Sequence, residues 1–261
     1  MDNHLWSQAT WPELARLGLR GAESKTPSGG ETPRVVALLP VGAVEAHGPH
    51  LPLITDVTIA VAAAKAAAPG LETRGYRTRV LPAITYTAAP FAAGFPGTIS
   101  VRPSTVVALI RDVAASVGAQ GVTALVLVNA HLDPDHVASL REAATRSREA
   151  LAVVFPDISR KPWALRMTDE FKSGACHAGQ YETSVVMAAA PDSVREDVRR
   201  RLPENSTSLS EAIGRGVTTF EEAGVSEAYC GAPAAATSEE GVQTIQTLGQ
   251  IVIDSVCEEL G

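Results

Sequence analysis

The chain has 261 residues, 45% of them hydrophobic, and a formal net charge of -7 at pH 7. A chain of this size and composition can bury a substantial core, and we expect residues 1–261 to form one domain. The acidic balance and the absence of a long run of Lys and Arg argue against a surface built to bind nucleic acid or an anionic membrane, so we expect a small molecule as partner.

The N-terminal sequence and the cysteines indicate the compartment. "MDNHLWSQATWPELARLG" lacks the charged and apolar regions of a signal peptide, and no apolar stretch is long enough to span a bilayer. Cys176, Cys230 and Cys257 are widely spaced and odd in number, which is typical of a reducing compartment. We therefore expect a cytoplasmic protein without a membrane partner.

Strands and helices are predicted to alternate along the chain. Residues 1–33 should hold an N-terminal amphipathic helix and, over 23–33, a flexible loop rich in Gly, Pro, Ser and Thr. The continuous apolar runs that follow are typical of buried strands, and they cover 34–42, 76–84, 122–130 and 151–157.

Helices are expected between and after these strands. They begin at Asp56, at Ser104, which is a suitable N-cap, at Asp133, and near Ser238 for a long C-terminal helix. The alternation predicts an α/β fold, a three-layer α/β/α sandwich with a mainly parallel central sheet.

Five of the six histidines fall in three short windows that also hold carboxylates. In the first window, "VEAHGPHLPLITD", Glu45 and His47 are two residues apart at the predicted end of a strand, so both should project to the same side. Asp56 then arrives at the start of the next helix. The carboxyl ends of strands are where open parallel sheets hold their ligands.

The second and third windows repeat this arrangement. In "LVNAHLDPDH" a buried strand runs out into Asn129, His131 and Asp133. In "CHAGQYETS" His177 and Glu182 lie five residues apart, ahead of an apolar helix. We expect the three windows to converge above the sheet.

Imidazole and carboxylate groups without paired thiolates suit Zn, Mn or Fe(II). Three carboxylates and a bridging hydroxide would neutralise two divalent ions, and Glu45, Asp56 and one of Asp133 or Glu182 supply that number. We therefore predict a centre of two divalent metal ions. His50 and His136 are expected to support the structure or the ligands, His4 to lie at the surface, and Asp135 to stand in the first turn of a helix.

The same residues stand in motifs that resemble the creatininase (creatinine amidohydrolase) family. The family's pattern "PVGSxEQHGPHLPLxTD" appears here as "PVGAVEAHGPHLPLITD" at 40–56. Further matches follow in the family's order, namely "FPGTIS", "VNAH", "HAGQYETS" and "GAPAAATSEEG". The similarity extends from about Val36 to Gly241, which is most of the chain.

This resemblance implies a creatininase-like α/β/α fold, a two-metal site, hydrolysis of an amide or cyclic amide C–N bond, and a homo-oligomer, usually a hexamer that is a trimer of dimers. It also implies ligand roles. Glu45 and His131 would hold one ion, His47 the other, and Asp56 would bridge them. Asp133 or Glu182 would supply the remaining carboxylate.

The resemblance further implies how the reaction proceeds. A metal-activated hydroxide would attack the carbonyl carbon, and His177 or a carboxylate of the metal site such as Glu182 would pass a proton to the leaving nitrogen. We expect Asn129, Phe95 and Tyr181, which lie in these motifs, to contact the substrate.

The sequence departs from the family pattern around the substrate. An "EH" pair that many relatives carry before "FPGT" is absent, and Asn129-Ala130 replaces Asn-Gly. The aromatic pair with which creatininase closes over creatinine is also missing, since the segment 162–179 offers only Trp163 and Phe171. We therefore expect a substrate other than creatinine, such as another small amide, a lactam, a formamide or a peptide C-terminus. Two alternatives remain open, which are a non-hydrolytic ring closure or dehydration at the same metals, and a catalytically inactive binding or scaffold protein.

Overall fold

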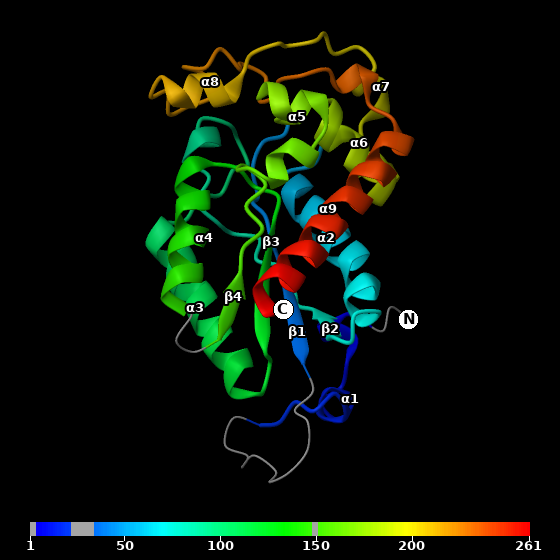
Figure 1. The fold of residues 1–261 in the computed structure, drawn as a ribbon. Helices are drawn as coiled ribbons and strands as arrows, with labels where there is room; N and C mark the ends of the chain where they lie inside the picture. The colour runs from blue at the N-terminus through cyan, green and yellow to red at the C-terminus, as the bar shows by residue number, and fades with distance from the viewer. Residues whose placement is uncertain (1–3, 22–33, 148–150) are drawn as a thin grey trace.

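The computed structural model describes residues 4–21, 34–147 and 151–261, and the loop predicted over 23–33 lies outside them. Within the described residues, four parallel strands form one sheet in the order β2-β1-β3-β4 (Figure 1). Each predicted apolar run contains one of them, so all four strand predictions are confirmed. The strands are β1 (Val35–Val41), β2 (Arg77–Val80), β3 (Ala124–Asn129) and β4 (Ala152–Val154).

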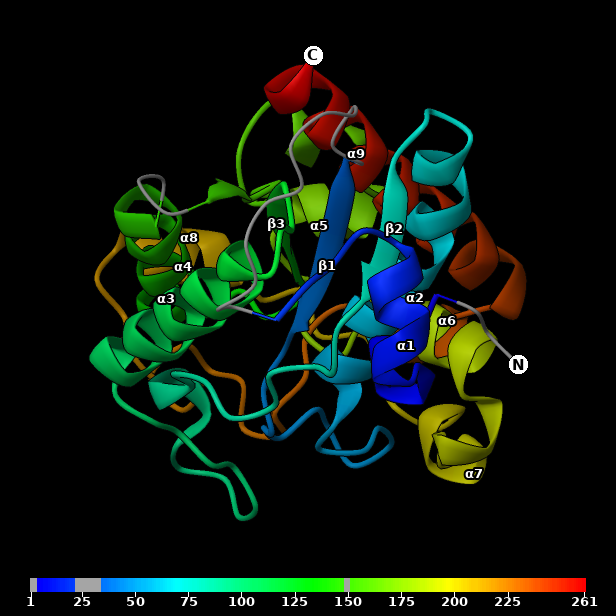
Figure 2. The ribbon, with the colours of Figure 1, turned by 90° about the horizontal axis from the view of Figure 1, so that it is seen from below.

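Helices cover both faces of this sheet, and α3 and α4 lie on the opposite face from α2, α6 and α9 (Figure 2). The longer helices are α2 (Thr55–Glu72), α3 (Pro103–Ala119), α4 (Pro134–Ser147), α6 (Gln180–Ala189) and α9 (Ser238–Leu260). The short ones are α1 (Trp11–Arg16), α5 (Asp169–Ser173), α7 (Glu196–Arg199) and α8 (Leu209–Gly214). Single 3-10 turns are η1 (Trp6–Gln8), η2 (Pro90–Ala92), η3 (Trp163–Arg166), η4 (Pro191–Ser193) and η5 (Pro233–Ala235).

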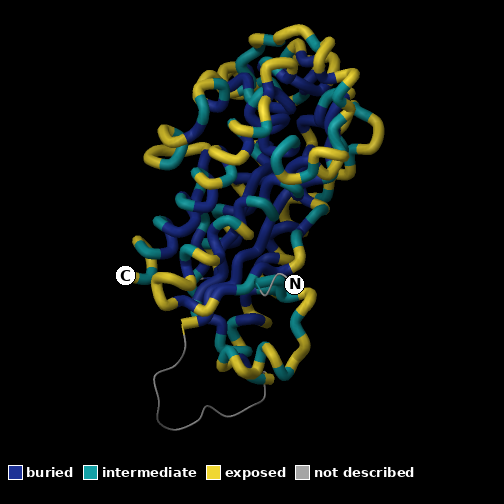
Figure 3. Tube along the Cα trace, turned by 90° about the vertical axis from the view of Figure 1, so that its right-hand side faces the viewer, coloured by how far each residue is buried: buried dark blue, intermediate teal, exposed yellow. Residues whose placement is uncertain are grey.

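Successive residues of a strand pack into two separate hydrophobic cores, one on each face of the sheet, because side chains alternate between the faces. Leu38 and Val126 pack with α2, α6 and α9, whereas Leu39 and Leu127 pack with α3 and α4. All seven residues of β1 are buried, as its unbroken apolar run predicts. Figure 3 shows the buried residues gathered along the strands and beyond their ends. The predicted three-layer α/β/α sandwich is therefore confirmed.

Two helix starts test the capping predictions. The C-terminal helix begins at Ser238 as predicted, and the Thr237 side chain accepts the Glu240 N–H. Ser104 as an N-cap is wrong, because α3 begins one residue earlier at Pro103. Proline has a preset φ and no N–H to satisfy, and it therefore suits the first helical position. Among the helices of the described residues, none combines the length and hydrophobicity that a bilayer crossing requires.

A glycine brings the end of β1 against the start of α2. A Cβ at Gly42 would lie 2.5 Å from the backbone nitrogen of Val57 and 2.7 Å from the carbonyl carbon of Asp56. No side chain fits at these distances, so only glycine permits the approach. The contact fixes Asp56 beside the loop that leaves β1.

Candidate metal centre

The candidate site lies beyond the carboxyl ends of β1 and β3. Asp56 is the second residue of α2, and His131 comes two residues after β3, as predicted. The placement of Glu45 and His47 on a strand is wrong, because β1 ends at Val41 and both residues lie in the loop that leads to α2. Their side chains still meet, since His47 Nε2 lies 3.8 Å from Glu45 Oε1.

The third window reaches the same place from another part of the chain. Glu182 is in the first turn of α6, and His177 lies three residues before that helix begins. The six polar residues that meet here are all buried, and none is more than 9% exposed. They are Glu45, His47, Asp56, His131, His177 and Glu182.

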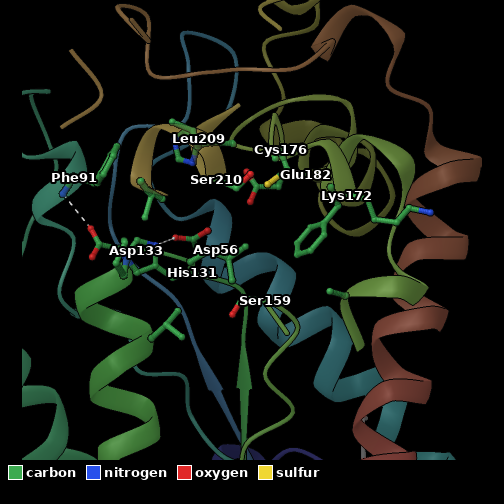
Figure 4. Close-up of a pocket in the computed structure, with 18 of the residues that line it drawn as sticks. Asp56, Phe91, His131, Asp133, Ser159, Lys172, Cys176, Glu182, Leu209 and Ser210 are labelled. Carbon is green, nitrogen blue, oxygen red and sulfur yellow. Dashed lines mark hydrogen bonds and ion pairs between the residues drawn. The ribbon is translucent and has the colours of Figure 1, made fainter. Parts of the chain in front are cut away.

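Asp56 stands between two imidazoles. Its Oδ1 lies 3.2 Å from His47 Nε2, and its Oδ2 lies 3.1 Å from His131 Nδ1. Glu45 Oε1 is 3.2 Å from the same His131 nitrogen, and Glu182 Oε2 is 3.6 Å from the same His47 nitrogen. Figure 4 shows Asp56 beside His131.

These distances define two groups of candidate metal ligands that share one carboxylate. Glu45, Asp56 and His131 form one group, and His47, Asp56 and Glu182 form the other; within each, the ligand atoms lie within 4.8 Å of one another. The structure thus brings together the residues that the resemblance assigned to each ion, with Asp56 common to both. A third group of this kind contains His177 with Glu45 and His47.

Backbone carbonyls orient the three imidazoles. His47 Nδ1 donates to Glu45 O at 3.1 Å, His131 Nε2 to Ala88 O at 2.9 Å, and His177 Nε2 to Ala46 O at 2.9 Å. A carbonyl oxygen only accepts, so each of these nitrogens carries a proton, and the other nitrogen of each ring faces the cluster, where it can bind a cation once it is deprotonated. This pairing of one ring nitrogen with a carbonyl is typical of metal-binding histidines.

Several atoms at the centre make no hydrogen bond of acceptable geometry although they are fully buried. They are His47 Nε2, His131 Nδ1 and Asp56 Oδ2. Buried polar atoms without partners are costly, and here they point at one another across a small space. Oxygen and imidazole donors arranged in this way fit borderline divalent ions such as Zn, Mn or Fe(II).

Opposite charges control the protonation of the two central imidazoles. Burial lowers the pKa of His47, but the carboxylates of Asp56, Glu182 and Glu45 outweigh burial and raise that pKa to about 10. The pKa of His131 is likewise raised well above its usual value, because Glu45 and Asp56 overcome the effect of burial. Burial raises the pKa of Glu182 to about 8. The carboxylates therefore need positive charge, and divalent cations supply it while using the imidazole lone pairs.

His177 has different surroundings from the other two imidazoles. Its Nδ1 lies 3.8 Å from Glu45 Oε1, and its ring stacks at 4.3 Å on His47 and at 4.5 Å on Phe220. Burial and the neighbouring His47 lower the pKa of His177 to about 4. A neutral imidazole that carries a lone pair at the edge of the cluster is suited to accept a proton and return it.

Asp133 and Glu182 are the alternatives for the remaining ligand, and their carboxylates have different hydrogen-bond partners in the structure. Both oxygens of Asp133 accept backbone N–H groups. Oδ2 accepts from Phe91 at 3.0 Å (Figure 4), and Oδ1 accepts from Asp135 at 2.9 Å. Glu182 accepts one N–H, from Ala178 at 2.6 Å, and belongs to a ligand group. The geometry favours Glu182 as the ligand and gives Asp133 a capping role at the start of α4.

A pair of substitutions separates these roles. We expect Glu182→Gln to lower metal affinity by at least about tenfold, because it removes a charged ligand. Asp133→Ala should keep the metal and lower the free energy of unfolding by about 1–3 kcal/mol, because two N–H groups lose their acceptor. Metal titration and denaturant unfolding measure the two effects. Loss of metal from Asp133→Ala, with full retention in Glu182→Gln, would reverse the assignment.

The three residues predicted to contact substrate do not line the cavity beside the cluster. Asn129 donates to His131 O and accepts from His131 N and His136 Nε2, so its amide holds the His131 segment. Tyr181 is 2% exposed and packs edge-on against Phe171 in the core. Phe95 packs against the ring of Phe220, one residue removed from the cavity.

The remaining polar residues lie as the sequence indicated. His50 and His136 are fully buried, and their Nε2 atoms bond to Thr183 and Asn129. His4 is partly exposed, with its Nε2 3.1 Å from Glu72. Asp135 stands in the first turn of α4, as predicted.

A cavity of about 640 Å³ opens from the cluster. Its walls include the rings of Phe91, Phe171 and Phe220, and of the two aromatic residues singled out near His177, Phe171 lines the cavity and Trp163 does not. Phe91 and Phe220 were not predicted from the sequence. They lie 129 positions apart and stack edge-on at 5.2 Å, a long-range contact that no local pattern marks.

Glu170 is a second residue that the sequence did not reveal. Its carboxylate accepts the N–H groups of Gln180 at 2.9 Å, Tyr181 at 2.7 Å and Ala232 at 2.7 Å. A carboxylate at the N-terminus of α6 satisfies unpaired amides and complements the helix dipole. Glu170 therefore holds the turn of the chain that carries Glu182.

Comparison with known proteins relates this geometry to a family. The family model of creatininase, described as creatinine amidohydrolase, matches residues 22–256. Two solved structures, one titled creatinine amidohydrolase (creatininase) and one titled creatininase Mn, each superpose with a TM-score of 0.67 at 23% identity. Both superpositions cover 98% of this chain, with 97% and 98% of the respective structures. This likeness supports the fold.

Curated relatives are similar over much of the sequence. A mycofactocin precursor peptide peptidase of Mycolicibacterium smegmatis is 31% identical over 211 residues, which are 79% of this chain and 78% of the relative. One of Mycobacterium tuberculosis is 32% identical, covering 88% and 86%. A creatinine amidohydrolase of Pseudomonas putida is 27% identical over 62% of this chain and 67% of its own. By its sequence and its fold, the chain belongs to the creatininase family.

Proposed function

We propose that the protein is a metal-dependent amidohydrolase that cleaves an amide or cyclic amide C–N bond of a small molecule or short peptide at a centre of two divalent ions. The observation that carries this proposal is the position of Asp56, whose two oxygens face imidazole nitrogens of two different ligand groups, His47 Nε2 and His131 Nδ1. Glu45 and His131 would hold one ion, and His47 and Glu182 the other. When bound, such ions lower the pKa of water and polarise a carbonyl oxygen.

The residues of this chain would supply orientation and proton transfer. His177 stays neutral near pH 7, because burial and His47 lower its pKa to about 4. Its Nε2–H is fixed on Ala46 O, so Nδ1 is the atom that would take a proton and deliver it to the leaving nitrogen.

The comparisons with known proteins support the general class of reaction in this proposal. Creatininase family enzymes are amidohydrolases, and the relatives carry the names of peptidases and of a creatinine amidohydrolase. Peptide cleavage and hydrolysis of a small amide both break a C–N bond at a carbonyl, so one arrangement of groups serves either reaction.

Removal of the metal tests the proposal directly. We expect purified protein to contain divalent metal, to lose both metal and activity on an amide and dipeptide panel after chelation, and to regain both with Zn or Mn. In ¹⁸O-labelled water the product carboxylate should carry the label, which a ring closure or dehydration would not give. Undiminished turnover by metal-free protein contradicts the proposal.

A further inference from the structure

The charged groups that line the cavity are separated by sign. The acidic ones lie at its buried end, and none is more than 6% exposed; they are Glu45, Asp56, Asp133 and Glu182. The basic ones are Arg141, Lys161 and Lys172, of which both lysines are exposed. The cavity therefore has an anionic floor, suited to cations, and a basic rim.

Apolar walls separate the two ends. Leu132, Val137, Leu209 and the three phenylalanines line the cavity. Two further lining residues are exposed although they are large and apolar, Leu165 at 59% and Ile213 at 36%. Four of the exposed lining residues, Lys161, Leu165, Lys172 and Ile213, are called the mouth below. Exposed apolar side chains at a cavity entrance favour a ligand whose apolar part extends out to them.

The volume indicates the size of that ligand. A cavity of about 640 Å³ is in the range of about 300–1,000 Å³ in which proteins bury drug-sized molecules. A ligand confined to the metal centre would leave the apolar walls and the mouth in contact with water. The cavity is thus shaped for an elongated substrate.

The three basic side chains differ in their partners. Arg141 forms an ion pair with Asp157 at 2.6 Å and bonds to Ser159 at 3.2 Å. Lys172 pairs with the exposed Asp169 at 2.7 Å. Lys161 has no ion-pair partner anywhere in residues 4–21, 34–147 and 151–261, and Asp157, the acidic side chain nearest to it in the chain, is already engaged by Arg141. The charge of Lys161 is therefore uncompensated.

From these observations we infer that the substrate is an elongated amide whose apolar segment fills the cavity and whose anionic group, remote from the scissile bond, binds Lys161 at the mouth. This inference rests on the proposed function and names the substrate class of the same site. Lys161 would select among substrates and take no part in the chemical step, because it contacts a part of the substrate that is remote from the scissile bond.

Hydroxamates provide probes whose chelating group would bind the metal centre. The set comprises monohydroxamates of straight-chain dicarboxylic acids of increasing length, the neutral methyl ester of each, and acetohydroxamate as the shortest member. Calorimetric titration of zinc-loaded protein gives the affinity of each probe without reliance on turnover. The variants are Lys161→Met and, as a control with the same change of charge, Arg111→Met, because Arg111 is exposed and does not line the cavity.

At the length that spans the cavity, we expect the free acid to bind wild-type protein about three- to fivefold more tightly than its ester, an advantage that falls with added salt. The ratio of the two affinities, free acid to ester, should fall to one in Lys161→Met and stay unchanged in Arg111→Met. Equal binding of acid and ester at every length, or a ratio that survives Lys161→Met, overturns the inference and leaves the proposed function intact. Failure of every probe to bind, acetohydroxamate included, contradicts the proposed metal centre itself.

Discussion

Asp56→Ala should remove both metal ions and lower turnover by more than about a hundredfold. Loss of a residue that only supports a ligand already costs about 10–100-fold in metal affinity or activity, and Asp56 stands between both ligand groups as a shared ligand candidate. Its two oxygens lie 3.2 Å from His47 Nε2 and 3.1 Å from His131 Nδ1, so one substitution takes a carboxylate from each group. Metal content measured by mass spectrometry after dialysis, together with the rate on the amide panel, checks this prediction.

Asp135→Ala is the matched control. Asp135 is also an aspartate in the first turn of a helix close to the site, but its side chain is exposed and belongs to no ligand group. It should keep full metal content and the wild-type rate. Circular dichroism of both variants ensures that loss of metal is not loss of fold. Retention of one tightly bound ion by Asp56→Ala would show that Asp56 serves a single ion and does not bridge two.

His177→Ala should keep the metal and lose about 10²- to 10⁴-fold in turnover. The reason is the separation of roles at the cluster, where His177 offers a neutral Nδ1 beside Glu45 while His47 and His131 face Asp56. The pH profile adds a second readout. The pKa of His177 is lowered, so the neutral base form is present above its pKa of about 4 and is lost as the pH falls through that value. The rate of the wild-type protein should therefore fall at low pH, and the rate of the variant should lose this dependence on pH.

The control for this substitution is His4→Ala, which changes a partly exposed imidazole at the edge of the sheet, beside β2 and outside every ligand group found among the described residues. It should leave both rate and metal content unchanged. His177 also belongs to a third ligand group with Glu45 and His47. Loss of one ion from His177→Ala would therefore assign His177 as a ligand and remove it from proton transfer.

The fold was predictable from the sequence because its signals are local. The central strands β1 and β3 are uninterrupted apolar runs, and α3 carries its buried residues with a helical period. The convergence of the three windows followed from one further rule, that the carboxyl ends of parallel strands meet at one edge of the sheet. Glu45, Asp56 and His131 come together for this reason, even though Glu45 stands in a loop.

Details that depend on side-chain partners were not predictable. Asp133 and Glu182 are equivalent as charges in a sequence, and only the structure shows that the oxygens of Asp133 are taken by backbone N–H groups. Tyr181 and Glu182 are adjacent on α6, about 100° apart around the helix, so they cannot both face the site. Glu182 faces it, and Tyr181 is buried in the core.

The cavity walls were the least predictable part. Phe91 and Phe220 come from segments far apart in the chain, and neither lies in a regular strand or in one of the long helices. Their packing against the ring of His177 arises from tertiary contacts alone. A motif match identified the groups that would hold metal, but it carried no information on what surrounds them.

Anomalous diffraction from crystals of metal-loaded protein tests the central claim most directly. The account predicts two peaks about 3.5–4 Å apart, a spacing typical of two-metal sites. One should be bound by Glu45 and His131, the other by His47 and Glu182, with Asp56 between them. A map with no peak at these side chains, at full metal loading of the crystals, would contradict it.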